Sequence, residues 1–463
     1  MSKPSTVGEL RESGYEVLPI KAELRCNLVR KLEAKEKLFD GILGYEDTVI
    51  PQLENALLAG QDIILLGERG QAKSRMIRGL VSLLDEETPA IEGCEINDNP
   101  YAPVCRACRD RVKELGDRTP VSWLHREQRY AEKLATPDVT MADLIGDIDP
   151  IKVTEGRYLS DELTVHYGLV PRANRGIFCI NELPDLVERL QVGLFNLMQE
   201  RDIQVKGYQI RLPLDILVVA SANPEDYTNR GRIITPLKDR YGAQIRTHYP
   251  RTPEVEIDIM ESEARRFEDG RTTLTPHFMK EIVAQVSALA RKSPDVNQRS
   301  GVSVRISTAN YESILGNAMR RALHTGEKTA APRISDLAYL KASTLGKLEL
   351  ETVEDERSEQ VLDGLVDQAV VNVFARYFKV TDFAALLTQF QEGASVGISG
   401  MAHSRTHARL AKKLGGFDKG LEKLRCDKPS TVASGVEFIL EGLHLNRKLN
   451  KVTARSGETS YEA

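Results

Sequence analysis

The sequence predicts an α/β fold in its first half, a parallel sheet with helices on both faces, followed by a largely helical second half. Between residues 42 and 250, short runs rich in Ile, Leu and Val alternate with helical stretches. Such runs are typical of strands buried on both faces, and their alternation with helices is typical of a parallel sheet. From about residue 252 onward, apolar residues recur at three- and four-residue spacing, which predicts amphipathic helices.

Composition limits the class of protein. The chain has 463 residues, enough for about three domains. Its net charge of −5 argues against a generally basic surface, so we expect no nucleic-acid partner. The sequence has no apolar run of about 18 residues, and its first residues lack the apolar segment of a secretory signal. Six cysteines do not make a disulfide scaffold, so we expect a cytoplasmic protein that does not bind membranes.

Changes in pattern divide the chain into four predicted parts. These are a helical lead-in (1–40), the α/β domain (41–250), a helical lid (251–350) and a helical C-terminal region with a basic tail (351–463). Within the last part, residues 392–400 (EGASVGISG) are predicted to be a flexible break. From residue 401 onward, Lys and Arg outnumber Asp and Glu by 12 to 7. This excess fits either an acidic partner or a solvated surface.

Buried strands are predicted at Asp62–Leu66, Gly176–Ile180 and Asp215–Ala222, and a β-hairpin at about 200–213. The first strand leads into the sequence GERGQAKS and then a helix, the context of a phosphate-binding loop. In such a loop Lys73 would reach the β- and γ-phosphates of a nucleotide, and the Ser74 hydroxyl would bind Mg²⁺.

The other loop residues would offer backbone N–H groups to phosphate; they are Gly67, Glu68, Arg69, Gly70, Gln71 and Ala72. The motif has Gly where this chain has Ala72. Alanine permits close approach of the backbone provided that its dihedral angles are not positive. The alternative is a glycine-rich turn in which Lys and Ser follow by chance.

Polar residues also follow the other two strands. Glu182 is a candidate general base, and Asn181 could hold a metal-bound water without supplying the charge of an Asp. Asn223, after the third strand, could contact the γ-phosphate or position the attacking water. Arg240, at the end of a predicted helix, suits an arginine finger that acts on a neighbouring subunit. Each could instead be an ordinary polar or surface residue.

Cysteines cluster in an apparent insertion at about 90–125. Cys105 and Cys108 form a Cys-x₂-Cys pair, which is half of a zinc site, with Cys94 and His125 as candidates for the remaining ligands. Three interpretations stay open: a small structural Zn²⁺ site, a redox-sensitive pair, and ordinary thiols.

Taken in order, these motifs resemble those of the AAA+ ATPases, and more narrowly the ATPase subunit (subunit I) of magnesium chelatase and the related MoxR-type ATPases. The matching segments are ILGYED (42–47), GERGQAKS (67–74), GIFCINELPDL (176–186), SANPED (221–226) and TPLKDRYG (235–242). Residues 136–172 resemble the helix-2 insert of this group. The resemblance covers roughly residues 40–345.

The resemblance implies a P-loop AAA+ sheet and a role for each matching residue. Lys73 and Ser74 would bind ATP and Mg²⁺, Glu182 would be the catalytic glutamate, and Asn223 the sensor-1 residue. Further positions are implied as follows: Arg240 as arginine finger, Arg305 as sensor-2 arginine, Tyr45 beside the adenine, and Asn181 in place of the family's metal-orienting Asp.

The resemblance further implies a hexameric ring with ATP sites between subunits. Such rings couple ATP hydrolysis to remodelling of a partner, usually one that carries a von Willebrand A domain. Two competing functions stay open. Asn181 favours a scaffold whose assembly is gated by ATP with little turnover, and a transcription-activator ATPase is the other alternative.

Overall fold

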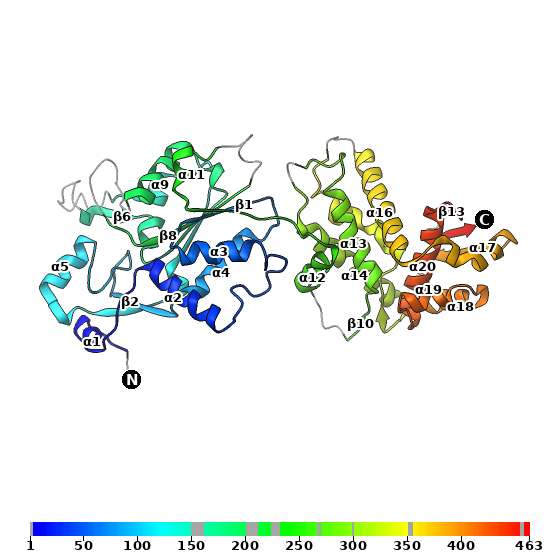
Figure 1. The fold of residues 1–463 in the computed structure, drawn as a ribbon, viewed down its shortest axis with the longest axis horizontal. Coiled ribbons are helices and arrows are strands. Elements are labelled where there is room, and N and C mark those ends of the chain that lie inside the picture. The colour runs from blue at the N-terminus through cyan, green and yellow to red at the C-terminus, as the bar shows by residue number, and fades with distance from the viewer. Residues whose placement is uncertain are drawn as a thin grey trace. The chain divides into compact units, whose positions relative to one another are not determined.

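The computed structural model describes residues 3–149, 162–200, 212–223, 232–265, 270–298, 301–350, 355–453 and 458–463. The chain forms two compact units, Met1–His248 and Tyr249–Ala463 (Figure 1). Each unit has cores of its own and is described separately. Among the described helices, none is long and apolar enough to cross a membrane.

A parallel sheet forms the centre of the N-terminal unit. Its strand order is β4-β7-β8-β1-β9, and every neighbouring pair is parallel. The strands are β1 (Ile63–Leu66), β4 (Tyr130–Leu134), β7 (Gly176–Asn181), β8 (Ile216–Ala222) and β9 (Ala243–Arg246). The three strands predicted from apolar runs are β1, β7 and β8, each within one residue of its predicted start and end.

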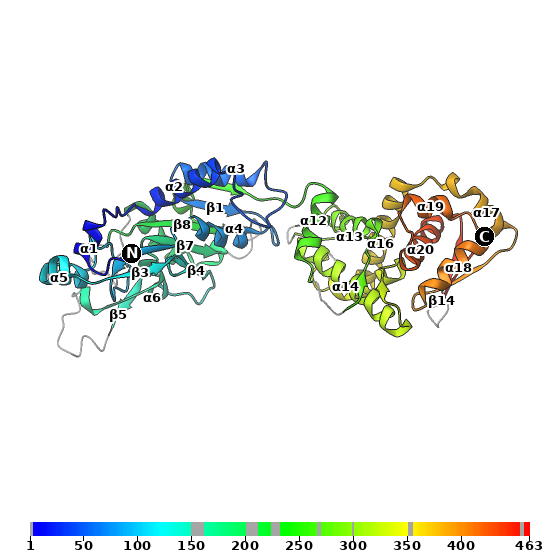
Figure 2. The same ribbon diagram turned by 90° about the horizontal axis from the view of Figure 1, so that it is seen from below.

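Helices cover both faces of this sheet. Alternate side chains of β1 point to opposite faces. Ile63 and Leu65 pack with helices α2, α3 and α4, whereas Ile64 and Leu66 pack with α9 and α11 (Figures 1 and 2). These helices are α2 (Ile20–Glu33), α3 (Val49–Leu58), α4 (Lys73–Gly79), α9 (Glu188–Glu200) and α11 (Thr235–Arg240). The predicted fold class is confirmed.

Residues before the sheet are part of the same unit. Helix α1 (Val7–Glu12) precedes α2, and Glu23 of α2 is buried beside Arg129. The Glu23 carboxylate accepts two hydrogen bonds from the Arg129 guanidinium, at 2.6 and 2.7 Å. Arg129 Nε also donates to the Arg175 carbonyl, at 2.8 Å. This buried ion pair links α2 to the residue that precedes β4.

Two insertions lie on the edge of the unit. The first runs from β2 through α5 to β3, and the two strands pair in antiparallel fashion. Short elements α6, β5, β6 and α8 make up the described part of the second, which is the predicted helix-2 insert. Their bounds are β2 (Glu87–Ile91), α5 (Arg106–Leu115), β3 (Val121–His125), α6 (Met141–Leu144), β5 (Gly146–Ile148), β6 (Val165–Tyr167) and α8 (Leu169–Arg172). The hairpin predicted at 200–213 lies largely outside the described residues.

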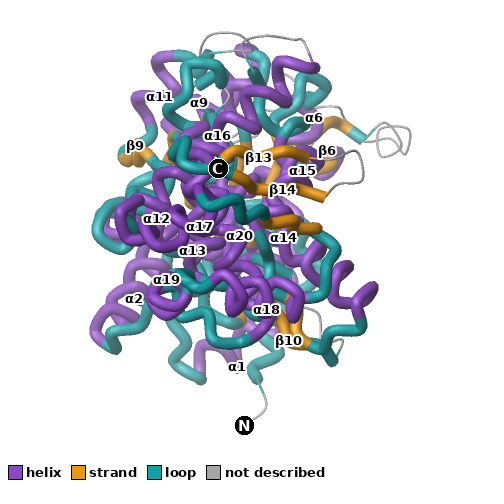
Figure 3. The backbone as a smooth tube through the Cα atoms, turned by 90° about the vertical axis from the view of Figure 1, so that its right-hand side faces the viewer, coloured by secondary structure: helices purple, strands orange, loops and turns teal. Residues whose placement is uncertain are grey.

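The C-terminal unit is mostly helical (Figure 3). Its main apolar core draws on residues from 257 to 461, including a stacked pair of rings, Phe278 and Phe438, with centroids 4.4 Å apart. The helices are α12 (Pro253–Glu263), α13 (His277–Ala290), α14 (Val304–Thr325), α15 (Leu340–Thr344), α16 (Asp355–Tyr377), α17 (Ala384–Gln391), α18 (Ser404–Leu414), α19 (Asp418–Lys423) and α20 (Pro429–Leu445). Two short strands, β10 (Thr272–Thr273) and β11 (Thr329–Ala330), pair in parallel.

The flexible break predicted at 392–400 is wrong. Strand β12 (Val396–Ser399) forms there and pairs with β14 (Glu458–Glu462), which also pairs with β13 (Asn450–Thr453). Val396 and Ile398 are buried, and the residues between and beside them are not. This alternation is a strand pattern, which the Gly and Ser residues around it concealed.

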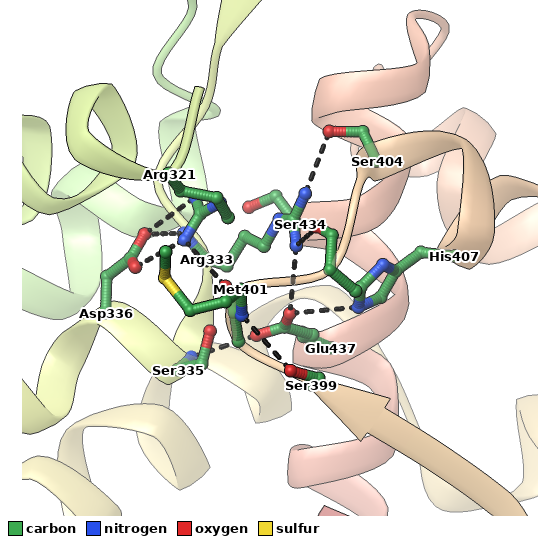
Figure 4. Close-up of polar contacts among 12 residues, drawn as sticks. Arg321, Arg333, Ser335, Asp336, Ser399, Met401, Ser404, His407, Ser434 and Glu437 are labelled. Atoms are coloured by element: carbon green, nitrogen blue, oxygen red, sulfur yellow. Dashed lines mark hydrogen bonds and ion pairs between the residues drawn. The ribbon is translucent and has the colours of Figure 1, made fainter. Parts of the chain in front are cut away.

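Buried charges join helices of the C-terminal unit (Figure 4). The Arg321 guanidinium donates to both carboxylate oxygens of Asp336, at 2.6 and 3.0 Å. Arg333 lies 3.9 Å from Glu437, and His407 lies 3.2 Å from the same carboxylate. Burial alone would raise the pKa of Glu437, but His407 and Arg333 lower that pKa to about 2. These opposite charges compensate one another inside the protein.

Candidate active site

The ends of three adjacent parallel strands bring the predicted site residues to one edge of the sheet. Lys73, Glu182 and Asn223 follow β1, β7 and β8 respectively. The backbone N–H of Gly67 donates to the Ala222 carbonyl at 3.1 Å, which joins the start of the loop to the end of β8. Carboxyl ends of parallel strands are where ligands bind in open α/β sheets.

The loop after β1 has the backbone of a phosphate cradle. A Cβ atom at Gly67 would overlap the Thr247 hydroxyl and the Gln71 side-chain oxygen, so only glycine fits there. Gly70 and Ala72 have positive φ angles, of 74° and 55°. The condition under which Ala72 could replace glycine without cost is therefore not met. A left-handed alanine costs about 1 kcal/mol, which makes Ala72 a strained position in the loop.

Lys73 is turned toward the loop itself. Its side chain is 7% exposed, and Nζ donates to the carbonyls of Gly67 and Glu68, the latter at 2.8 Å. Ser74, the next residue, is exposed in the first turn of α4. A buried ammonium that donates to backbone carbonyls of a loop suits an anionic ligand. These residues fit a nucleotide triphosphate with Mg²⁺.

Gln71 and Tyr45 hold the loop in place. The Gln71 side-chain oxygen accepts hydrogen bonds from the Glu68 N–H, at 3.1 Å, and from the Thr247 hydroxyl, at 2.5 Å. The Tyr45 hydroxyl lies 3.0 Å from the Gln71 carbonyl and 2.8 Å from the His248 carbonyl. Burial raises the pKa of Tyr45 to about 12. Tyr45 is therefore a neutral donor that connects the residues expected near an adenine to the phosphate loop.

Glu182 has a strained backbone at the end of β7. Its φ of 54° is left-handed, a conformation that non-glycine residues adopt at a cost and often at functional sites. Its N–H donates to the Ser221 hydroxyl at 3.2 Å, and its side chain is partly exposed. Asn223 is buried one residue beyond β8. Ser221, which the sequence reasoning did not single out, connects the ends of β7 and β8.

Asn181 belongs to a polar network that the sequence reasoning missed. Its amide donates to Glu132, and its side-chain oxygen accepts from Ser221 at 3.1 Å. Glu132 also accepts from the Arg78 guanidinium at 2.8 and 2.9 Å. Arg78 lowers the pKa of Glu132, which is therefore ionised. An Asp in place of Asn181 would oppose a second carboxylate, whereas the Asn can donate to it.

The two predicted arginines occupy different surroundings. Arg240 is the last residue of α11. Its guanidinium contacts α9, where it donates to Gln199 at 2.9 Å and stacks over the Phe195 ring at 5.1 Å. It also contacts Asp239, its chain neighbour. Arg305 is exposed near the start of α14 in the C-terminal unit. The contacts of Arg240 and the position of Arg305 do not by themselves assign either arginine a function.

The cysteines gather as expected, but with a different fourth residue. Ligand atoms of Cys94, Asp98, Cys105 and Cys108 all lie within 4.8 Å of one another. His125 is wrong as a candidate ligand, because it is not in this group. Its ring nitrogen instead accepts from the Glu127 N–H at 3.4 Å.

Charge in this cysteine group is unevenly distributed. Hydrogen bonds from Cys105 and Cys108 lower the pKa of Cys94 to about 3, and burial with the nearby Cys94 raises the pKa of Asp98 to about 6. All six cysteines of the chain are free.

Comparisons with known proteins point to one group of relatives. A family profile described as "Sigma-54 interaction domain" matches residues 154–237. The magnesium-chelatase subunit ChlI of Nephroselmis olivacea is 25% identical over 327 residues, which cover 65% of this chain and 85% of that protein. ChlI-2 of Arabidopsis thaliana is 28% identical over 269 residues, which cover 55% of this chain and 60% of that protein.

Two solved structures resemble parts of the chain. The complex between subunits BchI and BchD of magnesium chelatase includes a chain 21% identical to this one, with a TM-score of 0.36, over 70% of this chain and 98% of that one. NtrX from Brucella abortus in complex with ATP is 15% identical, with a TM-score of 0.38, over 84% of this chain and 72% of that one. The sequence relatives and the five-stranded parallel sheet confirm the resemblance: the chain is similar to subunit I of magnesium chelatase and has the sheet expected of an AAA+ protein.

Proposed function

We propose that this protein is a ring-forming motor that hydrolyses ATP to ADP and phosphate and uses the energy to remodel a partner protein. The observation that carries the proposal is that Lys73 and Glu182 follow β1 and β7, whose carboxyl ends lie at the same edge of the sheet. A buried cation for phosphate and a partly exposed carboxylate for water then lie at one edge of the sheet. Separate groups for the anion and for the nucleophile are what phosphoryl transfer to water requires.

Each residue has a proposed role in that reaction. The backbone of Gly67–Ala72 and the Lys73 ammonium bind the phosphates, and the Ser74 hydroxyl binds Mg²⁺. Mg²⁺, when bound, supplies charge stabilisation to the transferring phosphoryl group. Glu182 accepts the proton of the attacking water, which Asn223 orients. Tyr45 lies beside the adenine.

Magnesium binding depends on Asn181 and its neighbours. The Asn181 oxygen would hold a water ligand of Mg²⁺, and Glu132 would supply nearby the negative charge that an Asp at position 181 would carry. The hydrogen bond between these two residues supports this proposal.

Arg240 is proposed to complete the site of an adjacent subunit. An exposed guanidinium, held by Gln199 and Phe195 rather than by a buried carboxylate, supports a role outside its own protomer. Arg305 would sense the γ-phosphate from the lid. The ring is proposed to be hexameric, as in the MoxR-type group.

The partner is proposed to carry a von Willebrand A domain. Support comes from the relatives, which are named magnesium-chelatase subunits, and from a solved complex of BchI with BchD. A role in magnesium chelation is a finer proposal on the same basis. The cytoplasm is the proposed location.

A phosphate-release assay with purified chain and Mg²⁺ tests the proposed activity. Turnover per chain should rise with protein concentration, because a neighbour completes each site. Lys73→Ala should abolish ATP binding, and Glu182→Gln should retain binding but lose turnover at least 100-fold. Glu188→Gln, an exposed glutamate on α9, is the matched control and should behave as wild type. Full turnover by Glu182→Gln would refute the catalytic assignment.

A mixing experiment tests Arg240. Arg240→Ala and Lys73→Ala should each be inactive alone. Mixed in equal amounts, they should recover about one quarter of wild-type turnover, because a Lys73→Ala subunit lends its arginine to an intact phosphate loop. Arg189→Ala, an exposed arginine on α9, is the control. If the mixture shows no turnover although subunits exchange between wild-type rings, the arginine finger is not Arg240.

Two other functions are supported by particular observations. Asn181 in place of Asp supports an ATP-gated scaffold, for which ATP would promote assembly with very slow phosphate release. The match to a sigma-54 interaction domain supports a transcription activator. Binding to RNA polymerase holoenzyme containing sigma-54, measured with and without an ATP analogue, distinguishes that function from the motor.

The cofactors are proposed to be ATP, Mg²⁺ and a structural Zn²⁺. The zinc is independent of the nucleotide, because its ligands come from the cysteine group and none from the phosphate loop.

A further inference from the structure

The turn around Cys94 and the start of α5 have the geometry of a metal site. Ligands at zinc–sulfur distances of about 2.3 Å in a tetrahedron lie about 3.8 Å apart. Here one atom from each of Cys94, Asp98, Cys105 and Cys108 falls within 4.8 Å of the others. All four residues belong to the described chain and three of them are buried.

Local backbone structure aims the ligands inward. Asn97 has a φ of 54°, which curls the chain between Cys94 and Asp98. The Asp98 N–H donates to the Cys94 sulfur at 3.4 Å, and the Cys108 N–H donates to the Cys105 sulfur at 3.3 Å. Backbone N–H groups stabilise the thiolate form of cysteine, which is the form that binds metal.

Asp98 provides an independent sign of a missing ligand. The residue is 0% exposed, and Oδ1 has no hydrogen-bond partner among the described residues. Its other oxygen, Oδ2, accepts from the Cys105 N–H at 2.9 Å. An unpartnered buried carboxylate oxygen is costly, and a cation bound by Oδ1 and the sulfurs would satisfy it.

We propose that Cys94, Asp98, Cys105 and Cys108 bind one structural Zn²⁺, with Asp98 as the fourth ligand. Three thiolates and one carboxylate leave no open position, so the metal has no catalytic role. The set favours zinc over Mg²⁺ or Ca²⁺, because these hard cations select oxygen ligands.

The proposed zinc joins two parts of the N-terminal unit. On one side, the Arg106 N–H at the start of α5 donates to Glu162 at 2.6 Å, beside the helix-2 insert. On the other, the Asn174 amide donates to the Ile96 carbonyl at 3.0 Å, just before β7. The metal thus fixes the base of the insert to the strand that leads to Glu182. If the insert engages the partner protein of the proposed function, zinc positions that contact.

Metal content of the full-length chain tests the site. Protein purified without chelators should contain about one zinc per chain by mass-spectrometric elemental analysis. Cys105→Ser should contain almost none, and Asp98→Asn should bind zinc at least tenfold more weakly in competition with a chromogenic chelator. Cys26→Ser, an exposed cysteine on α2, and His125→Ala are controls that should keep full zinc.

Cobalt substitution gives a readout that does not depend on folding of a variant. Wild-type protein refilled with Co²⁺ should show thiolate-to-cobalt charge-transfer bands and the intense visible bands of tetrahedral coordination. Zinc removal should also speed amide exchange at residues 162–175.

Two outcomes would overturn the proposal. One is a chain that contains no zinc and takes up no Co²⁺ with all six thiols reduced. The other is a disulfide among Cys94, Cys105 and Cys108, seen as a 2 Da mass loss. Neither outcome would affect the ATPase assignment, which the phosphate-release assay tests separately.

Discussion

Both units bury cations, and Lys73 of the N-terminal unit differs from Arg321 of the C-terminal unit in the groups to which it donates. In the N-terminal unit, the Lys73 ammonium donates to the uncharged carbonyls of its own loop. In the C-terminal unit, the Arg321 guanidinium faces the Asp336 carboxylate with two hydrogen bonds. A guanidinium that forms two hydrogen bonds to one carboxylate is held in a fixed geometry. An ammonium that donates to loop carbonyls can turn toward an anion, which is the role proposed for Lys73.

The largest expected effect comes from breaking the structural pair. Arg321→Met should lower the free energy of unfolding of the C-terminal unit by about 3–5 kcal/mol, because Asp336 is left buried without its cation. Guanidinium denaturation followed by circular dichroism measures this effect. Arg320→Met, at the exposed neighbouring position, should cost less than about 1 kcal/mol.

Lys73→Met tests the other side of the comparison. We expect it to lower the free energy of unfolding of the N-terminal unit by less than Arg321→Met lowers that of the C-terminal unit, because the variant removes hydrogen bonds to neutral backbone carbonyls of the loop. ATP binding should nevertheless be lost. A loss of stability as large as that of Arg321→Met would contradict the distinction between the two cations.

The second effect is a pH dependence confined to the C-terminal unit. Glu437 has a pKa of about 2 in the folded chain against 4.5 in the reference state. Because folding lowers the pKa of Glu437, ionised Glu437 stabilises the folded chain fully at pH values above 4.5. This contribution is lost as the pH falls from 4.5 toward the folded-state pKa of about 2. By pH 3 about 2 kcal/mol should be lost. The free energy of unfolding should fall between pH 7 and pH 3 by less in Glu437→Gln than in wild type, and the two falls should differ by that amount.

The third effect concerns the network beside the phosphate loop. Asn181→Asp should lower the free energy of unfolding by about 1–3 kcal/mol, since a donor to Glu132 is replaced by a second carboxylate. The double variant Asn181→Asp with Glu132→Gln removes the repulsion between carboxylates and should recover part of that loss, although it also removes the carboxylate that accepts from Arg78. Asn55→Asp, on the exposed face of α3, should have little effect. Equal losses in the single and double variants would exclude the carboxylate repulsion.

The smallest effect tests the strain in the loop. Ala72→Gly should raise the free energy of unfolding by up to about 1 kcal/mol, because glycine adopts a positive φ without a steric cost. Ala59→Gly, where φ is −84°, should change stability in the opposite direction by a similar amount. Chemical denaturation of wild type, Ala72→Gly and Ala59→Gly measures both changes in the free energy of unfolding. Destabilisation by Ala72→Gly would show that the left-handed alanine carries no strain.

Sequence reasoning succeeded where local pattern determines structure. The apolar runs at β1, β7 and β8 and the helical spacing of α12 and α13 each sufficed to predict the element. It failed at β12, because Gly and Ser around Val396 and Ile398 favour a loop until a distant strand, β14, pairs with them. Local sequence does not contain that partner.

Sequence reasoning also failed to predict which side chains contact one another. The spacing of Cys105 and Cys108 predicted a site, yet its fourth residue is Asp98 rather than His125, since the curl at Asn97 decides which residue points inward. Glu132 lies 49 positions from Asn181 in the chain, so no short motif could pair them. Register between β4 and β7 is what brings them together.

Helix α2 has a practical consequence for experiments on this protein. Glu23 is the carboxylate that neutralises Arg129 inside the N-terminal unit. A shortened version that starts at the first family motif, near residue 42, would leave that guanidinium enclosed and unneutralised. Loss of activity in such a fragment would then report damaged folding rather than a regulatory role for the removed segment, so deletion studies should keep α2 or replace Arg129 along with it.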